Sequence, residues 1–383
     1  KLLPENSWNY NYNLSFKLYL EYYWCMFSCY GFSRGEPIFE ILINKAKSRL
    51  DKMEIYFRKT MLCTGYYRPE EAILSGLAAL DQMGLRIPIN PGKIYLIKEI
   101  LFIKQQLIGK ENSLLDLSEM SNDRAKRIMS LLANLTPPTS LINPNLFSLI
   151  LLKMTNISLR YGNTDYSSFA YACYGIICSS RLGDFKKAVK MQEIALALAE
   201  KYNNYSVKCK VYYTVGIYLS HWNKHLRNSL KYGEMANCYA HETGDWLMMG
   251  VVQTEMVQIK CMLGESLRGI HDQFEIALEH INYGMPDSLN LLNTINQFIK
   301  NLKGETINSF SFSTEDYDEN TVADSLIRTN KGFIVSHYYL MKIQSYYLHG
   351  GYMEAYDTAL KSYRKLDSVL GKMLYAENIY WAC

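Results

Sequence analysis

The stretch Gly350–Tyr363 reads GGYMEAYDTALKSY and decides the fold class. After the two glycines, large apolar and small side chains recur at steps of three, one, three, one and three residues: Tyr352, Ala355, Tyr356, Ala359, Leu360 and Tyr363. This spacing follows one face of a helix with 3.6 residues per turn. A glycine pair marks a turn. The stretch therefore predicts a helix that begins at a tight turn.

The same periodicity occurs elsewhere in the chain. It is found in three further sets: Ile38, Ile41, Leu42 and Ala46; Ala72, Ile73, Gly76, Leu77 and Leu80; and Tyr166, Phe169, Ala170, Cys173, Ile176 and Ile177. Ile38 and Ala72 lie 34 residues apart, which is the period of the tetratricopeptide repeat (TPR). The repeated unit is expected to be a pair of antiparallel helices.

Similar turns precede these helices. Gly183-Asp184-Phe185 leads into Ala188, and Tyr66-Tyr67-Arg68-Pro69 leads into Ala72. A small residue follows seven positions after each turn-proximal alanine (Ala79, Ala195 and Ser362), which lets a neighbouring helix approach closely. A helix pair cannot bury its apolar face alone, so such pairs stack. The predicted fold is all-α, a TPR-like helical-repeat superhelix (α-solenoid).

Two irregular segments divide the expected repeats. IPINPG (Ile87–Gly92) predicts a loop, and the polar segment Gly304–Ser325 carries acids at Glu315, Asp316, Asp318 and Glu319. We therefore predict N-terminal TPR-like repeats at 1–86 and central degenerate repeats at 87–303. A flexible acidic linker or loop is predicted at 304–325 and C-terminal TPR-like helices at 326–383. Solvent is expected to surround the acidic side chains.

Composition excludes several classes of protein. The 383 residues include 41 Lys and Arg against 37 Asp and Glu, so no basic excess indicates nucleic acid. The longest nearly uncharged helical stretch, 166–180, is shorter than the roughly 20 residues of a membrane span. The nine cysteines are scattered and form no CxxC pair, which favours free thiols in a reducing compartment. The predicted location is cytoplasmic.

No pattern of residues predicts a catalytic, cofactor-binding or metal-binding site. Phosphate-binding GxxxxGK[ST] and dinucleotide-binding GxGxxG motifs do not occur in the chain. His221 and His225 form HxxxH, but Trp222 stands where a zinc hydrolase needs glutamate. We expect this segment to be a turn between helices and the two histidines to pack or cap. His337 and His349 are predicted to be interface or surface residues.

Tyrosine is abundant, with 32 residues, and several aromatic residues adjoin one another. Because a helix turns about 100° per residue, some members of each group must face away from the core. The candidate interaction surface comprises Tyr22, Tyr23, Trp24, Tyr338, Tyr339, Tyr346 and Tyr347. The alternative, which we favour, is a thick helical core with amphipathic rims.

Several segments, in a fixed order, carry a family resemblance. They are LLPENSW (Leu2–Trp8), Tyr19-Leu20-Glu21, NPNLFSLILLKMTNISLRYGN (Asn143–Asn163), SSFAYACYGIICSSRLGDFKKA (Ser167–Ala188), HWNKHLRNSL (His221–Leu230), ETGDW (Glu242–Trp246) and SHYYLMKIQSYYLHGGYMEAYDTAL (Ser336–Leu360). Together they resemble the helical region of large bacterial multidomain signalling proteins. In that family a Ser/Thr-kinase-like domain and a STAND-type AAA ATPase precede the region, and a GAF domain and a sensor histidine kinase follow it. The chain departs from the family near His225, where a proline is usual, and at Tyr22 and Tyr23, where small residues are usual.

The resemblance implies a non-catalytic regulatory or scaffolding region of a two-component signalling ATPase/kinase. Such a region mediates protein–protein or ligand-sensing interactions and couples them to the flanking domains. ATP is then expected in those domains and no cofactor in this segment. The expected partners are proteins or flanking domains of the same chain, and an unknown small-molecule signal is a further candidate ligand. Neither nucleic acid nor a membrane span is expected.

Two alternatives remain open. The first is a free-standing TPR-like adaptor that binds peptides or partner helices. The apolar end of the chain, Ile379–Cys383, speaks against it, because a terminal repeat should be polar on its outer face. The start at Lys1 likewise suggests a piece of a longer protein. The second alternative is an enzyme with an unrecognised site among the histidines and acids.

Overall fold

The computed structural model describes residues 6–109, 113–281, 285–328, 331–369 and 371–382. Helices dominate these residues, and no strand occurs among them; a single β-bridge joins Thr314 and Tyr317 within a loop. The prediction of an all-α fold is confirmed. Within the same residues, no helix combines the length and the apolar character that crossing a membrane requires.

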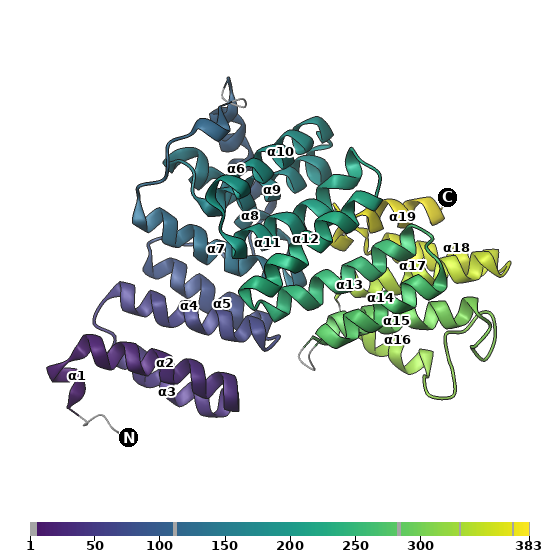
Figure 1. Cartoon of the computed structure of the whole chain (residues 1–383), viewed down its shortest axis with the longest axis horizontal. Coiled ribbons are helices and arrows are strands. Elements are labelled where there is room, and N and C mark those ends of the chain that lie inside the picture. Colours follow the sequence, from purple (N-terminus) through teal and green to yellow (C-terminus); the bar gives the residue numbers. More distant parts are fainter. Residues whose placement is uncertain (1–5, 110–112, 282–284, 329–330, 370, 383) are drawn as a thin grey trace. The chain divides into compact units, whose positions relative to one another are not determined.

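The contacts divide the described chain into two units. The described residues of Lys1–Ile108 and Glu119–Gly162 form unit 1, and those of Gly109–Ser118 and Asn163–Cys383 form unit 2. Unit 1 contains α1 (Ser7–Tyr10), α2 (Tyr12–Tyr30), α3 (Phe32–Lys45), α4 (Arg49–Gly65), α5 (Pro69–Gln82), α6 (Lys93–Leu107), α7 (Asp123–Ile142) and α8 (Pro144–Tyr161) (Figure 1). The predicted loop 87–92 joins α5 to α6, so it lies inside unit 1 and does not separate the units.

Unit 2 begins with the short 3₁₀ turn η1 (Leu114–Asp116). It continues through α9 (Asp165–Leu182), α10 (Phe185–Tyr202), α11 (Tyr205–Thr214), the π-helical η2 (Val215–Leu219), η3 (Ser220–Trp222), α12 (Arg227–Thr243), α13 (Trp246–Met262), α14 (Leu267–His280), α15 (Pro286–Leu302), α16 (Glu319–Arg328), α17 (Gly332–Leu348), α18 (Tyr352–Tyr363), η4 (Leu366–Val369) and α19 (Met373–Ala382). The predicted boundaries at 86 and 303 do not coincide with the division at 162.

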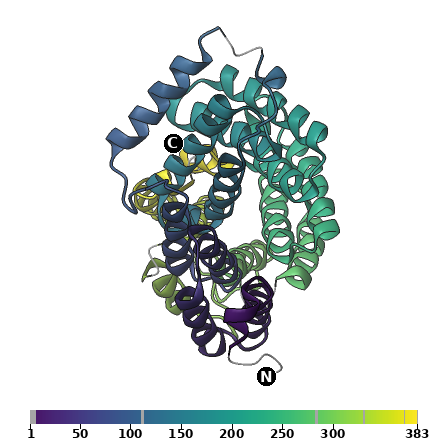
Figure 2. The ribbon, with the colours of Figure 1, turned by 90° about the vertical axis from the view of Figure 1, so that its left-hand side faces the viewer.

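Consecutive helices form the pairs that the repeat pattern predicts. The most extensive contacts join α2 to α3, α4 to α5, α7 to α8, α9 to α10, α11 to α12, α13 to α14 and α17 to α18. Each unit also stacks one pair on the next, through α5 and α7 in unit 1 and through α9 and α11 in unit 2. Figures 1 and 2 show these pairs from two directions. Ile38 and Ala72, the two positions 34 residues apart, are both buried in the second helix of a pair.

Two of the turns share one Gly-Asp design. Gly183 and Gly244 end α9 and α12 with φ angles of 65° and 64°, a left-handed conformation that favours glycine. Asp184 and Asp245 follow and cap the next helix, accepting the backbone N–H three residues later at 3.0 and 3.1 Å. Local chemistry therefore sets the sharp reversal between α9 and α10 and between α12 and α13.

A glycine lets α5 and α7 pack at close range. A Cβ atom at Gly76 would lie 2.4 Å from Cδ2 and 2.7 Å from Cγ of Leu135 on α7. Leu135 is fully buried, so it has little room to move away. Gly65, at the end of α4, has no neighbouring atom within 4 Å of such a Cβ.

We expect Gly76→Ala to lower the free energy of unfolding by about 1–3 kcal/mol through overpacking, reduced by up to about 1 kcal/mol of helix propensity. Gly65→Ala, the matched control, should be neutral or slightly stabilising. Urea denaturation followed by circular dichroism measures both. Equal stability of the two variants would contradict the close α5–α7 contact.

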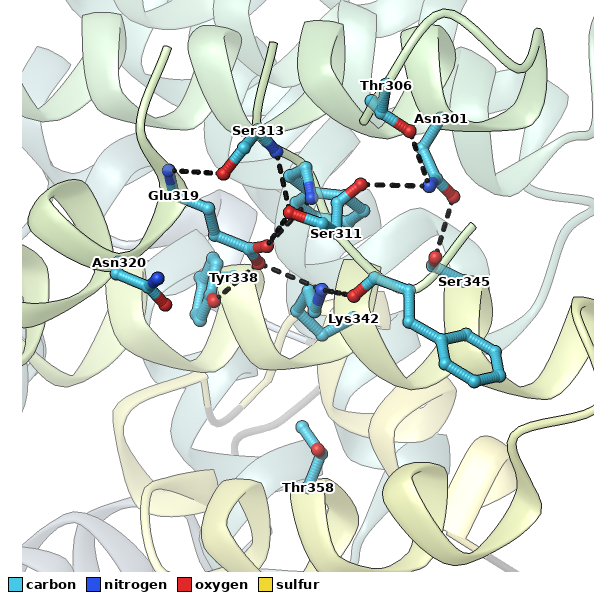
Figure 3. Close-up of polar contacts among 12 residues, drawn as sticks. Asn301, Thr306, Ser311, Ser313, Glu319, Asn320, Tyr338, Lys342, Ser345 and Thr358 are labelled. Atoms are coloured by element: carbon cyan, nitrogen blue, oxygen red, sulfur yellow. Dashed lines mark hydrogen bonds and ion pairs between the residues drawn. The ribbon is translucent and has the colours of Figure 1, made fainter. Parts of the chain in front are cut away.

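The acidic segment 304–325 contains a loop and the start of a helix. Its last seven residues begin α16. Asn301 at the end of α15 donates from Nδ2 to the carbonyl oxygens of Ser309 and Ser311, each at 3.1 Å, and accepts from the Ser345 hydroxyl at 2.7 Å. Figure 3 shows the contacts of Asn301 with Ser311 and Ser345. Specific polar contacts hold the loop 304–318 against the helices.

Glu319 was expected to be solvated, and the structure corrects this expectation. Its side chain is buried, with Oε1 accepting from the Tyr338 hydroxyl at 2.8 Å and lying 2.9 Å from Lys342 Nζ. Its Oε2 accepts from the backbone N–H of Phe312 at 2.7 Å (Figure 3). Burial lowers the pKa of Lys342, although the Glu319 carboxylate opposes this shift. An ion pair between α16 and α17 thus anchors the acidic segment.

Candidate interaction surfaces

The predicted aromatic residues of α2 divide between core and surface. Tyr23 is fully buried and packs against Phe27 and Phe39, so it belongs to the core of unit 1. Tyr22 is half exposed. Trp24 is partly buried, with the Arg58 guanidinium 5.5 Å from its ring centre. Only Tyr22 has the exposure of a contact residue.

The predicted tyrosines of α17 divide in the same way. Tyr338 is buried beside Glu319, while Tyr339 and Tyr346 are partly buried. Tyr347, at the end of α17, is half exposed and packs edge-on against Tyr352 of α18, with 5.4 Å between ring centres. The two predicted groups lie in different units, and neither forms a continuous aromatic surface.

The exposed aromatic side chains of unit 2 include a group on α18. Tyr352, Tyr356, Leu360 and Tyr363 are each between 50% and 70% exposed. We call these four residues the tyrosine face. Their steps of four, four and three residues place them on one stripe of the helix. Tyr347 extends this stripe onto α17.

Sequence periodicity placed these residues on one helix face together with Ala355 and Ala359, and the structure divides that set between surface and core. The buried side of α18 consists of small and hydroxyl-bearing residues: Ala355, Thr358, Ala359 and Ser362. They allow α18 to approach α17 closely and leave the tyrosines outside. The sequence did contain a signal for this arrangement. The small residues of α18 gather on one side of the helix, so its large residues must lie on the other side.

A buried ion pair fixes the segment that follows α18. Lys372 Nζ lies 2.5 Å from Glu255 Oε1 on α13 and 3.8 Å from the ring centre of Phe333. Burial opposes the charged form of Lys372, but the Glu255 carboxylate and the Tyr218 hydroxyl offset it and raise the pKa of this lysine. The charge holds η4 and α19 against α13 and α17, and α19 in turn contacts α18. The helix that carries the tyrosine face, α18, thus packs against α17 and α19 next to this ion pair.

The histidines of the HxxxH motif make local contacts. They lie in the predicted turn between helices, at η3 and just before α12. His225 Nδ1 accepts the backbone N–H of Arg227 at 3.2 Å, so it caps the start of α12. His221 packs on Trp222, and burial lowers its pKa to about 4. The described residues contain no group of three or more His, Cys, Asp or Glu side chains that could hold a metal ion.

The prediction for His337 is wrong. It was expected at an interface or surface, yet it is fully buried in α17, and neither ring nitrogen has a hydrogen-bond partner. Burial, with a smaller contribution from the Lys372 charge, lowers its pKa to about 3. His349, by contrast, is exposed at the end of α17, and its Nδ1 lies 2.9 Å from the carbonyl oxygen of Ser345.

Comparison with known proteins places the fold. No family model matches the chain. A solved Rap protein, complexed with competence and sporulation factor, matches with a TM-score of 0.59 and 11% identity over 94% of this chain and 88% of the other. This likeness confirms the predicted TPR-like helical-repeat fold.

The sequence is also similar to a signalling protein. The hybrid signal transduction histidine kinase G of Dictyostelium discoideum is 22% identical over 296 residues, which cover 72% of this chain and 8% of that protein. The chain thus matches only a small part of this relative, which is not bacterial. Together the two comparisons relate a TPR-like helical fold to a segment of a histidine kinase.

Proposed function

We propose that the chain is a non-catalytic regulatory helical-repeat region of a multidomain signalling protein. It binds a protein partner or a flanking domain of the same polypeptide and couples this contact to neighbouring ATPase and kinase domains. ATP binds in those domains and not in this segment. The observation that carries the proposal is the tyrosine face, and the match to part of a histidine kinase supports its signalling context.

The tyrosine face has the chemistry of a protein contact. Tyrosine offers a large apolar ring with a polar tip, which tolerates water in the free state and gains binding energy when covered. A stripe of four large exposed side chains on a short helix is more than scattered surface apolarity. Regulation requires the partner to bind two conformations of the region with different affinity.

The reading frame around this chain tests the signalling context. If it encodes neither an ATPase nor a kinase, the proposed coupling is contradicted. The alternative is then a free-standing TPR-like adaptor that binds peptides or partner helices. One observation favours that alternative. The match covers 88% of the Rap chain, so in that protein the helical fold makes up most of the chain. A small-molecule signal is tested separately by a thermal-shift screen against metabolites and nucleotides.

In the whole encoded protein, we expect Tyr352→Ser/Tyr356→Ser to change the rate of histidine autophosphorylation at least about fivefold, the lower end of typical coupling between sites. The change removes two contact rings and leaves the buried side of α18 intact. Tyr10→Ser, at an 82% exposed tyrosine of unit 1, is the matched control. Equal rates in all three proteins would contradict coupling through the tyrosine face.

A further inference from the structure

Helix α6 of unit 1 buries only part of its apolar surface. Ile103 and Leu107 are buried, and α6 packs against α8. Ile94, Ile97 and Leu101 are 81%, 54% and 61% exposed. They follow one another at steps of three and four residues, the spacing of a seam that packs against another helix.

The exposed side of α6 borders a groove of about 750 Å³. Its lining comes from Leu85 after α5, from α6, from the start of α7 and from α8. The apolar part includes Ile97, Leu101, Ile128 and Ile157. A volume of this size accepts several large side chains at once. The groove lies wholly within unit 1.

The groove is positively charged. Lys98, Arg124, Lys153 and Arg160 line it, against the single carboxylate of Glu99. Glu99 is already paired, since its Oε1 lies 2.6 Å from Lys153 Nζ and its Oε2 accepts from the Asn156 amide. Among the described residues, Lys98, Arg124 and Arg160 have no ion pair, although Arg124 Nε donates to the backbone oxygen of Met83 at 2.7 Å. Three cations therefore remain available around an apolar centre.

We propose that this groove binds an acidic amphipathic helix of a protein partner. The apolar face of that helix would lie along Ile94, Ile97 and Leu101, and its Asp or Glu side chains would meet Lys98, Arg124 and Arg160. A helix fits because the exposed seam has helical spacing and helix-in-groove docking uses such anchors. A flat anionic membrane would reach α6 but not the floor at Ile128 and Ile157. This surface is independent of the tyrosine face, which lies in unit 2.

Two synthetic helical peptides test the charge requirement. The first carries Leu at the a and d positions of three heptads and Glu at e and g, and the second replaces every Glu with Lys. Fluorescence anisotropy with the whole chain should show saturable binding of the acidic peptide and at least about tenfold weaker binding of the basic one. Higher salt should weaken the acidic complex. Equal binding of both peptides would overturn the proposal.

Variants of the chain test the location. Leu101→Glu and Lys98→Glu/Arg160→Glu should each weaken binding of the acidic peptide at least about tenfold. Leu74→Glu changes another leucine of unit 1 that is 57% exposed, and should leave binding within twofold. Circular dichroism checks that each variant is folded, and the double charge reversal leaves the apolar seam untouched. Native affinity in both groove variants would overturn the proposal.

Two further outcomes would contradict the acidic helix and indicate a different occupant of the groove. Binding to phosphatidylserine vesicles that Leu101→Glu abolishes and the acidic peptide does not displace would indicate a membrane surface. A concentration-dependent dimer, detected by sedimentation and lost in Leu101→Glu, would indicate a second copy of this chain. The Tyr352→Ser/Tyr356→Ser variant should bind the acidic peptide with native affinity. The peptide-binding proposal for the groove can therefore fail without contradicting the proposed function of the tyrosine face, and the reverse.

Discussion

Replacing Lys342 with alanine is expected to lower the free energy of unfolding by about 3–5 kcal/mol, the usual cost of breaking a buried ion pair from one side. Lys342 and Glu319 have side chains that are only 4% and 10% exposed, and their charged atoms lie 2.9 Å apart. Without the ammonium group, the Glu319 charge remains buried beside Phe312 and Tyr338. Lys342 Nζ also donates to the Phe310 carbonyl oxygen at 2.8 Å, a contact that the variant loses.

Urea denaturation of the transition that contains unit 2 measures this loss. Arg227→Ala is the control, because Arg227 pairs with Glu265 at 3.4 Å in a mainly exposed position and should cost at most about 1 kcal/mol. Glu319→Gln/Lys342→Met removes both charges. The Gln amide oxygen can still accept the Phe312 N–H, and its NH2 group can donate to the Tyr338 hydroxyl oxygen. We expect it to recover more than half of the loss. A Lys342→Ala cost as small as that of Arg227→Ala would show that the pair is solvated.

The helix pairs of this fold could be predicted because their signals are local. Gly183-Asp184 contains both the left-handed residue that ends one helix and the cap that begins the next, so the turn is legible within a few residues. The burial of Glu319 could not be predicted in this way. Its partners lie on another helix, and a carboxylate in an acidic stretch looks the same whether or not Lys342 faces it.

The candidate surfaces show a second limit of the sequence. Periodicity correctly identified α18 as a helix, but it grouped Ala355 and Ala359 with Tyr352 and Tyr356, which point to different surroundings. Residues four apart on a helix differ by only about 40° around its axis. The packing of neighbouring helices therefore decides which of them is buried. For α6, apolar residues on nearly every side would predict a fully buried helix. Only the structure shows that the side chains of Ile94, Ile97 and Leu101 are more than half exposed.

Lowering the pH from 7 to 5 is expected to reduce the stability of unit 2 by about 4 kcal/mol through two buried imidazoles, about 2 kcal/mol each. Folding lowers the pKa of His337 to about 3 and that of His221 to about 4, against about 6.5 in the unfolded chain. Below pH 6.5 the unfolded chain therefore binds two protons that the folded chain does not. Stability is complete above pH 6.5 and falls toward the folded pKa values.

Substitution of single histidines tests whether the buried imidazoles cause this loss of stability at low pH. His337→Leu removes one imidazole from a site where neither ring nitrogen is hydrogen-bonded, so it should cost little at pH 7. It should also flatten the fall between pH 7 and 5 by about 2 kcal/mol. The matched control is His241→Leu, which also removes an imidazole but at an exposed position of α12. Denaturant titrations at each pH provide the measurement. A stability that stays constant from pH 7 to 5 in the native chain would mean that His337 and His221 accept protons while folded. Burial of both rings opposes this, and the Lys372 charge opposes it further at His337.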